Sequence, residues 1–300
     1  MKLAITTHYM MEAYGDEDGI RRLADIGFDG LDFGLFRYPL DGPLFAGSEA
    51  ALEDYFGGLK AVADRAGIVV NQVHSQMPSY WTGDAGKTAF TWKALQKAIL
   101  AAGCLGSPYI VIHPAIPAGC RYSQGRAEAR ALNLEFYGSL TPLLEQHRVR
   151  MGIENMFSFD PERQRICPTV CAEAEEMIDY IDALGPQYVA CLDVGHSVLS
   201  GSGPADMARK LGPRLELMHA HENNGLDDCH MAPMIGFNRK THSSAIDWAE
   251  FAAALKAVGY RGMFSLEPDS FFAGYGPRLA HEAAVFLYAV ARQLVRDYGV

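Results

Sequence analysis

"LELMHAHEN", residues 215 to 223, is a short apolar run that ends in two histidines. Seven other runs have the same design, a few β-branched or apolar residues closed by polar ones. They are "KLAITTH" (2–8), "GLDFGLF" (30–36), "IVVNQVH" (68–74), "YIVIHP" (109–114), "VRMGIENM" (149–156), "YVACLDVGH" (188–196) and "GMFSLEPD" (262–269). Runs of this length that alternate with longer helical stretches are typical of repeated βα units around a parallel sheet.

Amphipathic stretches separate these runs, and apolar residues recur in them at three-to-four spacing, which predicts helices over 48–67, 86–106, 126–148 and 168–185. Glycine often follows the last helical turn as a stop signal. Pro168, followed by Thr169, predicts the start of the fourth of these helices.

Eight βα units without an intervening linker, low-complexity segment or charge block predict one domain over residues 1–300, a (β/α)8 TIM barrel. The active site of such a barrel lies at the C-terminal ends of its strands. A doubly wound open sheet is the alternative. The first βα turn lacks the G-x-G-x-x-G pattern that would support it.

Composition limits the class of protein. Hydrophobic residues make up 49% of the 300 residues and charged residues 21%, as in a globular domain with a large core. The N-terminus meets His8 and acids before any apolar run of signal length, and no stretch approaches the roughly 20 apolar residues of a membrane span. We therefore expect a cytoplasmic protein that does not bind membranes. Homo-oligomer formation is compatible with these features.

Cysteine usage and charge argue against two further classes, disulfide-stabilised proteins and proteins with a large basic surface for nucleic acid. The six cysteines form no close CxxC pair, so we expect reduced thiols. Cys191 and Cys229 lie beside acids, and we expect them to be buried spectators and not ligands. The net charge of −10 opposes the basic surface that nucleic-acid binding requires.

Polar residues gather at the predicted strand ends and include seven of the ten histidines. A buried carboxylate is costly unless it is paired or bound to a metal, so acids that follow apolar runs favour a functional site. The set comprises His8, His74, His113, Glu154, Asp193, His196, His219, His221, Asp228, His230 and Glu267.

Side chains alternate along a strand, so Glu154 shares a face with Gly152, Asp193 with Cys191, Glu267 with Ser265, and His221 with His219. If these faces point into the barrel, three carboxylates and an imidazole converge at its mouth. Mixed oxygen and nitrogen ligands with room for substrate suit an open catalytic site for a divalent ion. Spacing alone does not separate His219 from His221 as the nitrogen ligand.

The motifs "VHSQMP", "VIHPA", "GIENM", "LDVGH", "HAHENNGLDDCH" and "SLEPD", in this order, resemble the xylose-isomerase-like TIM-barrel superfamily. That superfamily includes sugar isomerases and epimerases and the endonuclease IV nucleases. The resemblance to its ketose 3-epimerases implies that one divalent ion (Mn, Mg, Co or Zn) is held by Glu154, Asp193, His221 and Glu267. It also implies that the two glutamates transfer a proton through an enediolate, with His196 as a helper.

Two further positions are compared with the epimerases. Asp160 matches an acid that lies six residues after the first glutamate, which implies a substrate contact. Asp227 occupies the position of the family's substrate-binding arginine, so the chain departs from the simple ketose 3-epimerase pattern there.

The resemblance to endonuclease IV implies a larger centre of two or three zinc ions and a phosphoester substrate. Its nine ligands would be His74, His113 and Glu154; Asp193, His221 and Glu267; and His196, Asp228 and His230.

The loops at the predicted mouth are rich in aromatic residues, which suit the C–H faces of a small sugar or polyol. We expect Tyr80, Trp81 and Phe157 to contact such a substrate and Arg121 to bind a phosphate or carboxylate on it. The sequence thus predicts a metal-dependent isomerase or epimerase of a sugar or polyol. The alternatives are a trinuclear zinc phosphoesterase, a lyase similar to inosose dehydratases, and a sugar-binding barrel without catalysis.

Overall fold

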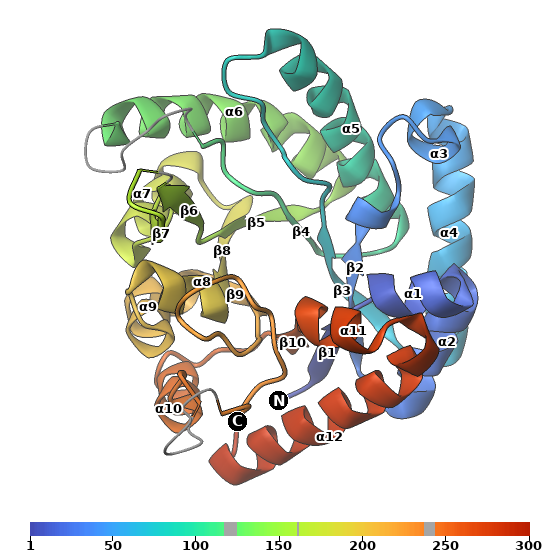
Figure 1. The fold of residues 1–300 in the computed structure, drawn as a ribbon. Helices are drawn as coiled ribbons and strands as arrows, with labels where there is room; N and C mark the ends of the chain where they lie inside the picture. The colour runs from blue at the N-terminus through green and yellow to red at the C-terminus, as the bar shows by residue number, and fades with distance from the viewer. Residues whose placement is uncertain (117–124, 161, 237–243) are drawn as a thin grey trace.

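Eight parallel strands form a barrel in the computed structural model, which describes residues 1–116, 125–160, 162–236 and 244–300. The strands pair in the order β10-β1-β2-β3-β4-β5-β8-β9, and a parallel bridge from Ala220 to Leu266 joins the two edges (Figure 1). All eight predicted runs are strands, and the barrel prediction is confirmed. Their bounds are β1 Leu3–Thr6, β2 Gly30–Gly34, β3 Val69–His74, β4 Tyr109–Val111, β5 Arg150–Glu154, β8 Tyr188–Asp193, β9 Leu215–His219 and β10 Phe264–Leu266.

Helices surround the barrel (Figure 1). Local signals set their ends: the Ser48 hydroxyl accepts from the amide of Ala51 at the start of α4, and Gly67 ends that helix in the left-handed region. The helices are α1 His8–Tyr14, α2 Asp16–Ile26, α3 Pro43–Ala46, α4 Glu49–Ala66, α5 Ala85–Cys104, α6 Arg126–His147, α7 Ala174–Leu184, α8 Val194–Ser200, α9 Pro204–Leu211, α10 Trp248–Ala257, α11 Asp269–Tyr275 and α12 Ala280–Tyr298, with short 3-10 turns at Leu35–Arg37, Gly212–Arg214 and Pro277–Leu279.

The predicted start of a helix at Pro168 is wrong. Strands β6 (Phe157–Asp160) and β7 (Arg165–Pro168) form an antiparallel hairpin after β5, and Pro168 pairs with Phe157 at its base. Helix α7 begins only at Ala174. Proline lacks an amide hydrogen, so it fits the edge of a small sheet as well as the first turn of a helix.

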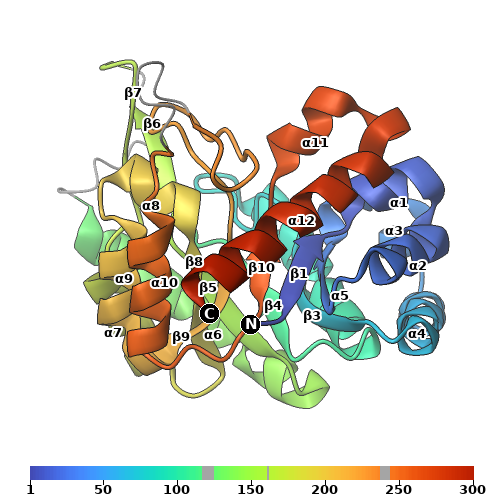
Figure 2. The ribbon, with the colours of Figure 1, turned by 90° about the horizontal axis from the view of Figure 1, so that it is seen from below.

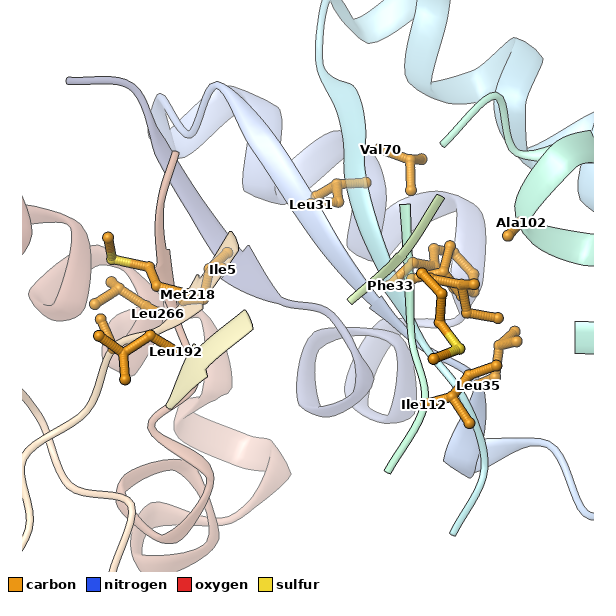
Figure 3. Packing of buried hydrophobic residues seen from close by; sticks show 14 of the residues in the cluster. Ile5, Leu31, Phe33, Leu35, Val70, Ala102, Ile112, Leu192, Met218 and Leu266 are labelled. Carbon is orange, nitrogen blue, oxygen red and sulfur yellow. The ribbon is translucent and has the colours of Figure 1, made fainter. Parts of the chain in front are cut away.

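Two layers of side chains give the barrel its core. Alternate strand residues pack outward against the helices, and Figure 3 shows part of this layer, including Ile5, Phe33 and Leu192. The inward residues form a separate small apolar cluster of Val111, Val189, Cys191 and Leu217. Polar groups complete the interior on the side of β2, β3 and β10: Asp32, Gln72 and Ser265.

Gly152 shows how tightly this interior is filled. A methyl group added there would lie 2.8 Å from Leu217 Cδ1 and 3.3 Å from both Cys191 Cβ and Val111 Cγ2. We expect Gly152→Ala to lower the free energy of unfolding by about 1–3 kcal/mol. Gly58, exposed in α4 with open space around it, is the matched control, where alanine should raise it by about 1 kcal/mol. Equal shifts in urea unfolding would contradict this account of the interior.

The loops that follow the strands rise at one end of the barrel. Figure 2 shows the β6–β7 hairpin, the segment after β9 and helix α11 together at that end. The chain termini meet, with the Met1 amino group 2.6 Å from the Val300 carbonyl oxygen. In the described part of the chain, no helix is long and apolar enough to cross a membrane. The end that carries the loops is therefore where the predicted site residues should gather.

Candidate metal centre

Four buried side chains meet at this end of the barrel: Glu154, Asp193, His219 and Glu267. Each offers one ligand atom, and these atoms all lie within 4.8 Å of one another. Glu154, Asp193 and His219 are the last residues of β5, β8 and β9, and Glu267 directly follows β10. Parallel strands place their carboxyl ends at the same rim, which is why residues so distant in sequence converge.

The structure places His219, and not His221, in this four-residue group. His219 Nδ1 lies 3.2 Å from Glu154 Oε1 and 3.4 Å from Glu267 Oε2. His221 Nε2 lies 3.1 Å from both oxygens of Asp193, and its ring stacks on His230 at a centroid distance of 3.8 Å. His221 thus neighbours the group and belongs to an adjacent set with His230 and Glu267.

Two more sets of candidate ligands flank the four. His74, His113 and Glu154 form one, with His113 Nε2 at 3.0 Å and His74 Nε2 at 3.6 Å from Glu154 Oε2. His196, Asp228 and His230 form the other. In it, Asp228 Oδ1 lies 3.0 Å from His230 Nε2 and 3.5 Å from His196 Nε2. The predicted strand-end residues are therefore brought together as one continuous cluster.

The donor set suits a cation. Glu154 Oε2 and His113 Nε2 are buried and 3.0 Å apart, yet neither makes a hydrogen bond with the described residues. Three carboxylates meet at the four-residue group, and none is more than 6% exposed. Close carboxylates in a dry interior repel each other unless positive charge lies between them. These residues fit a divalent ion bound by oxygen and nitrogen.

The pKa values reflect this crowding. Burial raises the pKa of Glu267 to about 8, although His219 and His230 oppose the shift. Burial also acts to raise the pKa of Glu154, but the charges of His219 and His113 outweigh it and hold that pKa well below its usual range. The two glutamates thus have unlike environments within one site.

Two residues that the sequence motifs did not single out hold the site in place. Asn155 joins β5 to β8: its Nδ2 donates to the Asp193 carbonyl and its Oδ1 accepts from the Asp193 amide. Glu222 is buried and accepts from Ser244 Oγ, Trp248 Nε1 and the amides of Met234 and Ile246. Both directly follow a predicted ligand, in "IEN" and "HEN", and that adjacency was the available signal.

The loop after β9 carries Asp228 and His230 to the cluster in a strained backbone. His230 has a φ of 26° and Met234 a φ of 67°, values that non-glycine residues rarely adopt. Two hydrogen bonds hold the loop there. The Met234 amide donates to Glu222, and His230 Nδ1 donates to the Glu267 carbonyl. Strain of this kind persists where the surroundings fix it and is common at functional sites.

Aromatic side chains border the cluster on two sides. Phe157, predicted to contact substrate, packs edge-on against His196 at a centroid distance of 4.9 Å. Phe36, which the sequence patterns did not predict as a site residue, packs edge-on against His74 at a centroid distance of 5.6 Å. Next to it, His8 Nε2 lies 3.8 Å from Asp269 Oδ2, so a polar pair adjoins the apolar wall.

The remaining predicted substrate residues are not brought to this cluster. Tyr80 packs on Phe136 of α6, and with Trp81 it lines a cavity of about 650 Å³ between α5 and α6 that includes none of the candidate ligands. Residues 75–84 connect β3 to α5, and Tyr80 and Trp81 lie in this connection beside the start of α5. Asp160 ends β6 and is 3.1 Å from Arg163 in the hairpin turn. Arg121 lies outside the described residues.

A sequence model described as xylose isomerase-like TIM barrel matches residues 20–289. The chain belongs to this family. The resemblance inferred from the motifs is confirmed.

Two related proteins match only part of this xylose isomerase-like chain. An uncharacterized protein of Methanocaldococcus jannaschii is 29% identical over 183 residues, or 59% of this chain and 56% of that protein. The D-psicose 3-epimerase of Enterocloster bolteae is 34% identical over 130 residues, or 43% of this chain and 36% of the epimerase. The chain thus spans little more than half the length of the first of these relatives.

Solved structures of the same fold match over the whole length. A D-tagatose 3-epimerase-like protein has a TM-score of 0.74 at 19% identity, covering 100% of this chain and 98% of that one. The IOLI protein, solved with a zinc atom, has a TM-score of 0.71 at 16% identity, covering 99% of each chain. At these identities the likeness establishes the xylose isomerase-like barrel and nothing finer.

Proposed function

We propose that this protein is a metal-dependent isomerase or epimerase of a sugar or sugar-derived polyol. The observation that carries the proposal is the group of Glu154, Asp193, His219 and Glu267 at the mouth of the barrel, with ligand atoms within 4.8 Å of one another. The partial match to a D-psicose 3-epimerase and the fold of a D-tagatose 3-epimerase-like protein support the substrate class. The zinc atom in the IOLI structure supports a divalent ion.

The two glutamates carry the proton transfer. A divalent ion held by the four residues would polarise the carbonyl and hydroxyl oxygens of the substrate. Each glutamate would act at one face of the reacting carbon, as a base when it is ionised and as an acid when it is protonated. The ionised glutamate would take the proton from one face and the protonated one would return a proton at the opposite face, which changes the configuration of the carbon.

His196 and Asp228 are placed to hold substrate hydroxyls. Asn155 fixes the His196 ring, because its carbonyl oxygen lies 2.9 Å from Nδ1. The opposite nitrogen then faces Asp228, 3.5 Å away. Phe157 and Phe36 provide apolar surface for the C–H faces of a sugar ring, and this mixture suits a neutral polyol.

Metal content tests the first requirement of this proposal. Protein purified without added metal or an affinity tag should contain about one Mn, Co, Mg or Zn ion per chain by elemental mass spectrometry. Removing a site-bound ion should lower the unfolding temperature, since an ion present at 100 times its dissociation constant contributes about 2.7 kcal/mol. Readdition should restore that temperature. A chain that holds no divalent ion under any of these conditions would overturn the proposal.

A trinuclear zinc phosphoesterase is the second candidate, and the two flanking ligand sets favour it. His74 with His113, and His196 with Asp228 and His230, could complete sites on either side of the four-residue group. This candidate predicts two or three zinc ions per chain and cleavage of abasic DNA or simple phosphodiesters. The net charge of −10 opposes a DNA substrate.

A substrate panel separates the proposed reactions. Free ketoses, aldoses and inositol-like polyols are incubated with the metal-loaded protein in deuterated water. Deuterium gain at one carbon, with formation of an isomer, supports the proposal. Loss of water to give a dehydrated product would instead identify a lyase of the inosose dehydratase type, and binding without turnover would identify a sugar-binding barrel.

A further inference from the structure

A buried acid below the four-residue group has no part in the proposed proton transfer. Asp32 lies in the middle of β2 and is 2% exposed. Three groups face one of its oxygens, Oδ2: Gln72 Nε2 at 2.8 Å, Ser265 Oγ at 3.4 Å and His219 Nε2 at 3.2 Å. They come from β3, β10 and β9, so this acid joins strands from both edges of the sheet order.

Stability does not explain why a carboxylate stands here. Burying an ionised acid is unfavourable, and an apolar residue would usually stabilise a barrel interior better. Within residues 1–116, 125–160, 162–236 and 244–300, His219 is the one basic group at ion-pair distance from Asp32. An acid kept at such a position is expected to act on that histidine.

The geometry of His219 shows what the acid does. Its Nε2 lies 3.2 Å from Asp32 Oδ2, at ion-pair distance but without a hydrogen bond to any described residue, while its Nδ1 lies 3.2 Å from Glu154 Oε1 and 3.4 Å from Glu267 Oε2. A carboxylate accepts hydrogen bonds only, so it favours the tautomer that carries its proton on Nε2. That tautomer leaves the lone pair on Nδ1 directed at the four-residue group.

We infer that Asp32 is a positioning residue that fixes the ring orientation and tautomer of His219 for metal binding, with Gln72 holding the acid in place. The inference rests on the proposed function, because it assumes that the four residues bind a divalent ion. A carboxylate behind a histidine ligand orients the ring and raises its basicity, and removal of such a partner lowers metal affinity by about 10- to 100-fold. His221 differs, because a backbone carbonyl, that of Glu222, lies 3.2 Å from its Nδ1.

Metal titration tests this inference. The metal-free full-length protein and its variants are titrated with Mn²⁺ in a calorimeter, and Co²⁺ absorption spectra are recorded in parallel. Asp32→Asn, which keeps the shape and removes the charge, should weaken Mn²⁺ binding by about 10- to 100-fold. Ser265→Ala removes a more distant contact to the same oxygen and is the matched control, expected to stay within about twofold of the unchanged protein, well below the 10- to 100-fold change expected for Asp32→Asn.

A measurement on the unchanged protein keeps the test valid if Asp32→Asn folds poorly. Nitrogen-15 spectra of the zinc-loaded protein should show His219 with its proton on Nε2 and zinc on Nδ1. Equal affinity of Asp32→Asn and the unchanged protein, or a proton on Nδ1, would overturn the inference. Absence of any metal binding by the unchanged protein would instead remove the proposed function, so the two failures are distinguishable.

Discussion

Glu267→Gln is expected to slow exchange of the substrate's carbon-bound proton with solvent by about 10²- to 10⁴-fold, the usual contribution of a general base. Glutamine keeps the size of the side chain and one oxygen ligand atom, so the variant should still hold the ion when enough metal is present to saturate its site. It cannot accept a proton, however. Glu154→Gln should have a similar effect on exchange or on formation of the isomer, because Glu154 is the other carboxylate at the reacting carbon in the proposed mechanism.

The measurement is deuterium incorporation into a turned-over sugar, followed by NMR, with metal content determined on the same samples. Glu250→Gln provides the matched control: it makes the same chemical change on α10, where Glu250 is exposed and pairs with Arg209. That variant should exchange at the unchanged rate. Retained exchange in both Glu154→Gln and Glu267→Gln would refute the roles assigned to these glutamates.

The barrel could be predicted because the sequence patterns that specify its strands and helices are local. Each strand is a short buried run, each flanking helix has its own apolar face, and alternation decides which residues point inward. Gly152 illustrates the agreement: the pattern places it on the inward face with Glu154, and in the structure its Cα faces Leu217, Cys191 and Val111 inside the barrel. The convergence of acids and histidines followed from this pattern, because all parallel strands end at one rim.

The sequence could not predict which residues of neighbouring strands lie at the same level along the barrel axis. His219 and His221 share a face, and the choice between them depends on the stagger of neighbouring strands. In the structure, Asp193 of β8 pairs with His219 of β9, so these two side chains lie side by side. The register depends on how two strands pair, so it cannot be predicted from the sequence of either strand alone.

The directions of the loops could not be predicted from the sequence either. Trp81 is aromatic and follows β3 closely, yet residues 75–84 carry it to the groove between α5 and α6. Pro168 fits both a hairpin edge and a helix start, and pairing with Phe157 decided between them. Phe36 reaches His74 from a 3-10 turn that ordinary helix and strand patterns do not reveal.

The last prediction concerns which of two histidines, His219 or His221, binds the principal ion. His219→Ala should weaken binding of the principal ion by more than the 10- to 100-fold expected for loss of an outer partner, because it removes one of four direct ligands. His221→Ala should have the smaller effect, since His221 Nε2 contacts only Asp193 within the four-residue group. The measurement is a competition titration of Mn²⁺ against a chelator, with each variant compared with the unchanged protein.

His147→Ala is the matched control, because His147 ends α6 outside the barrel interior and should leave the affinity unchanged. The opposite order, with loss of the ion in His221→Ala and its retention in His219→Ala, would restore the ligand set that the motifs implied and contradict the register argument. Equal large losses in both variants would mean that the two histidines bind ions that depend on each other. The trinuclear centre makes that prediction, because Glu154 and Glu267 would then be shared between neighbouring sites.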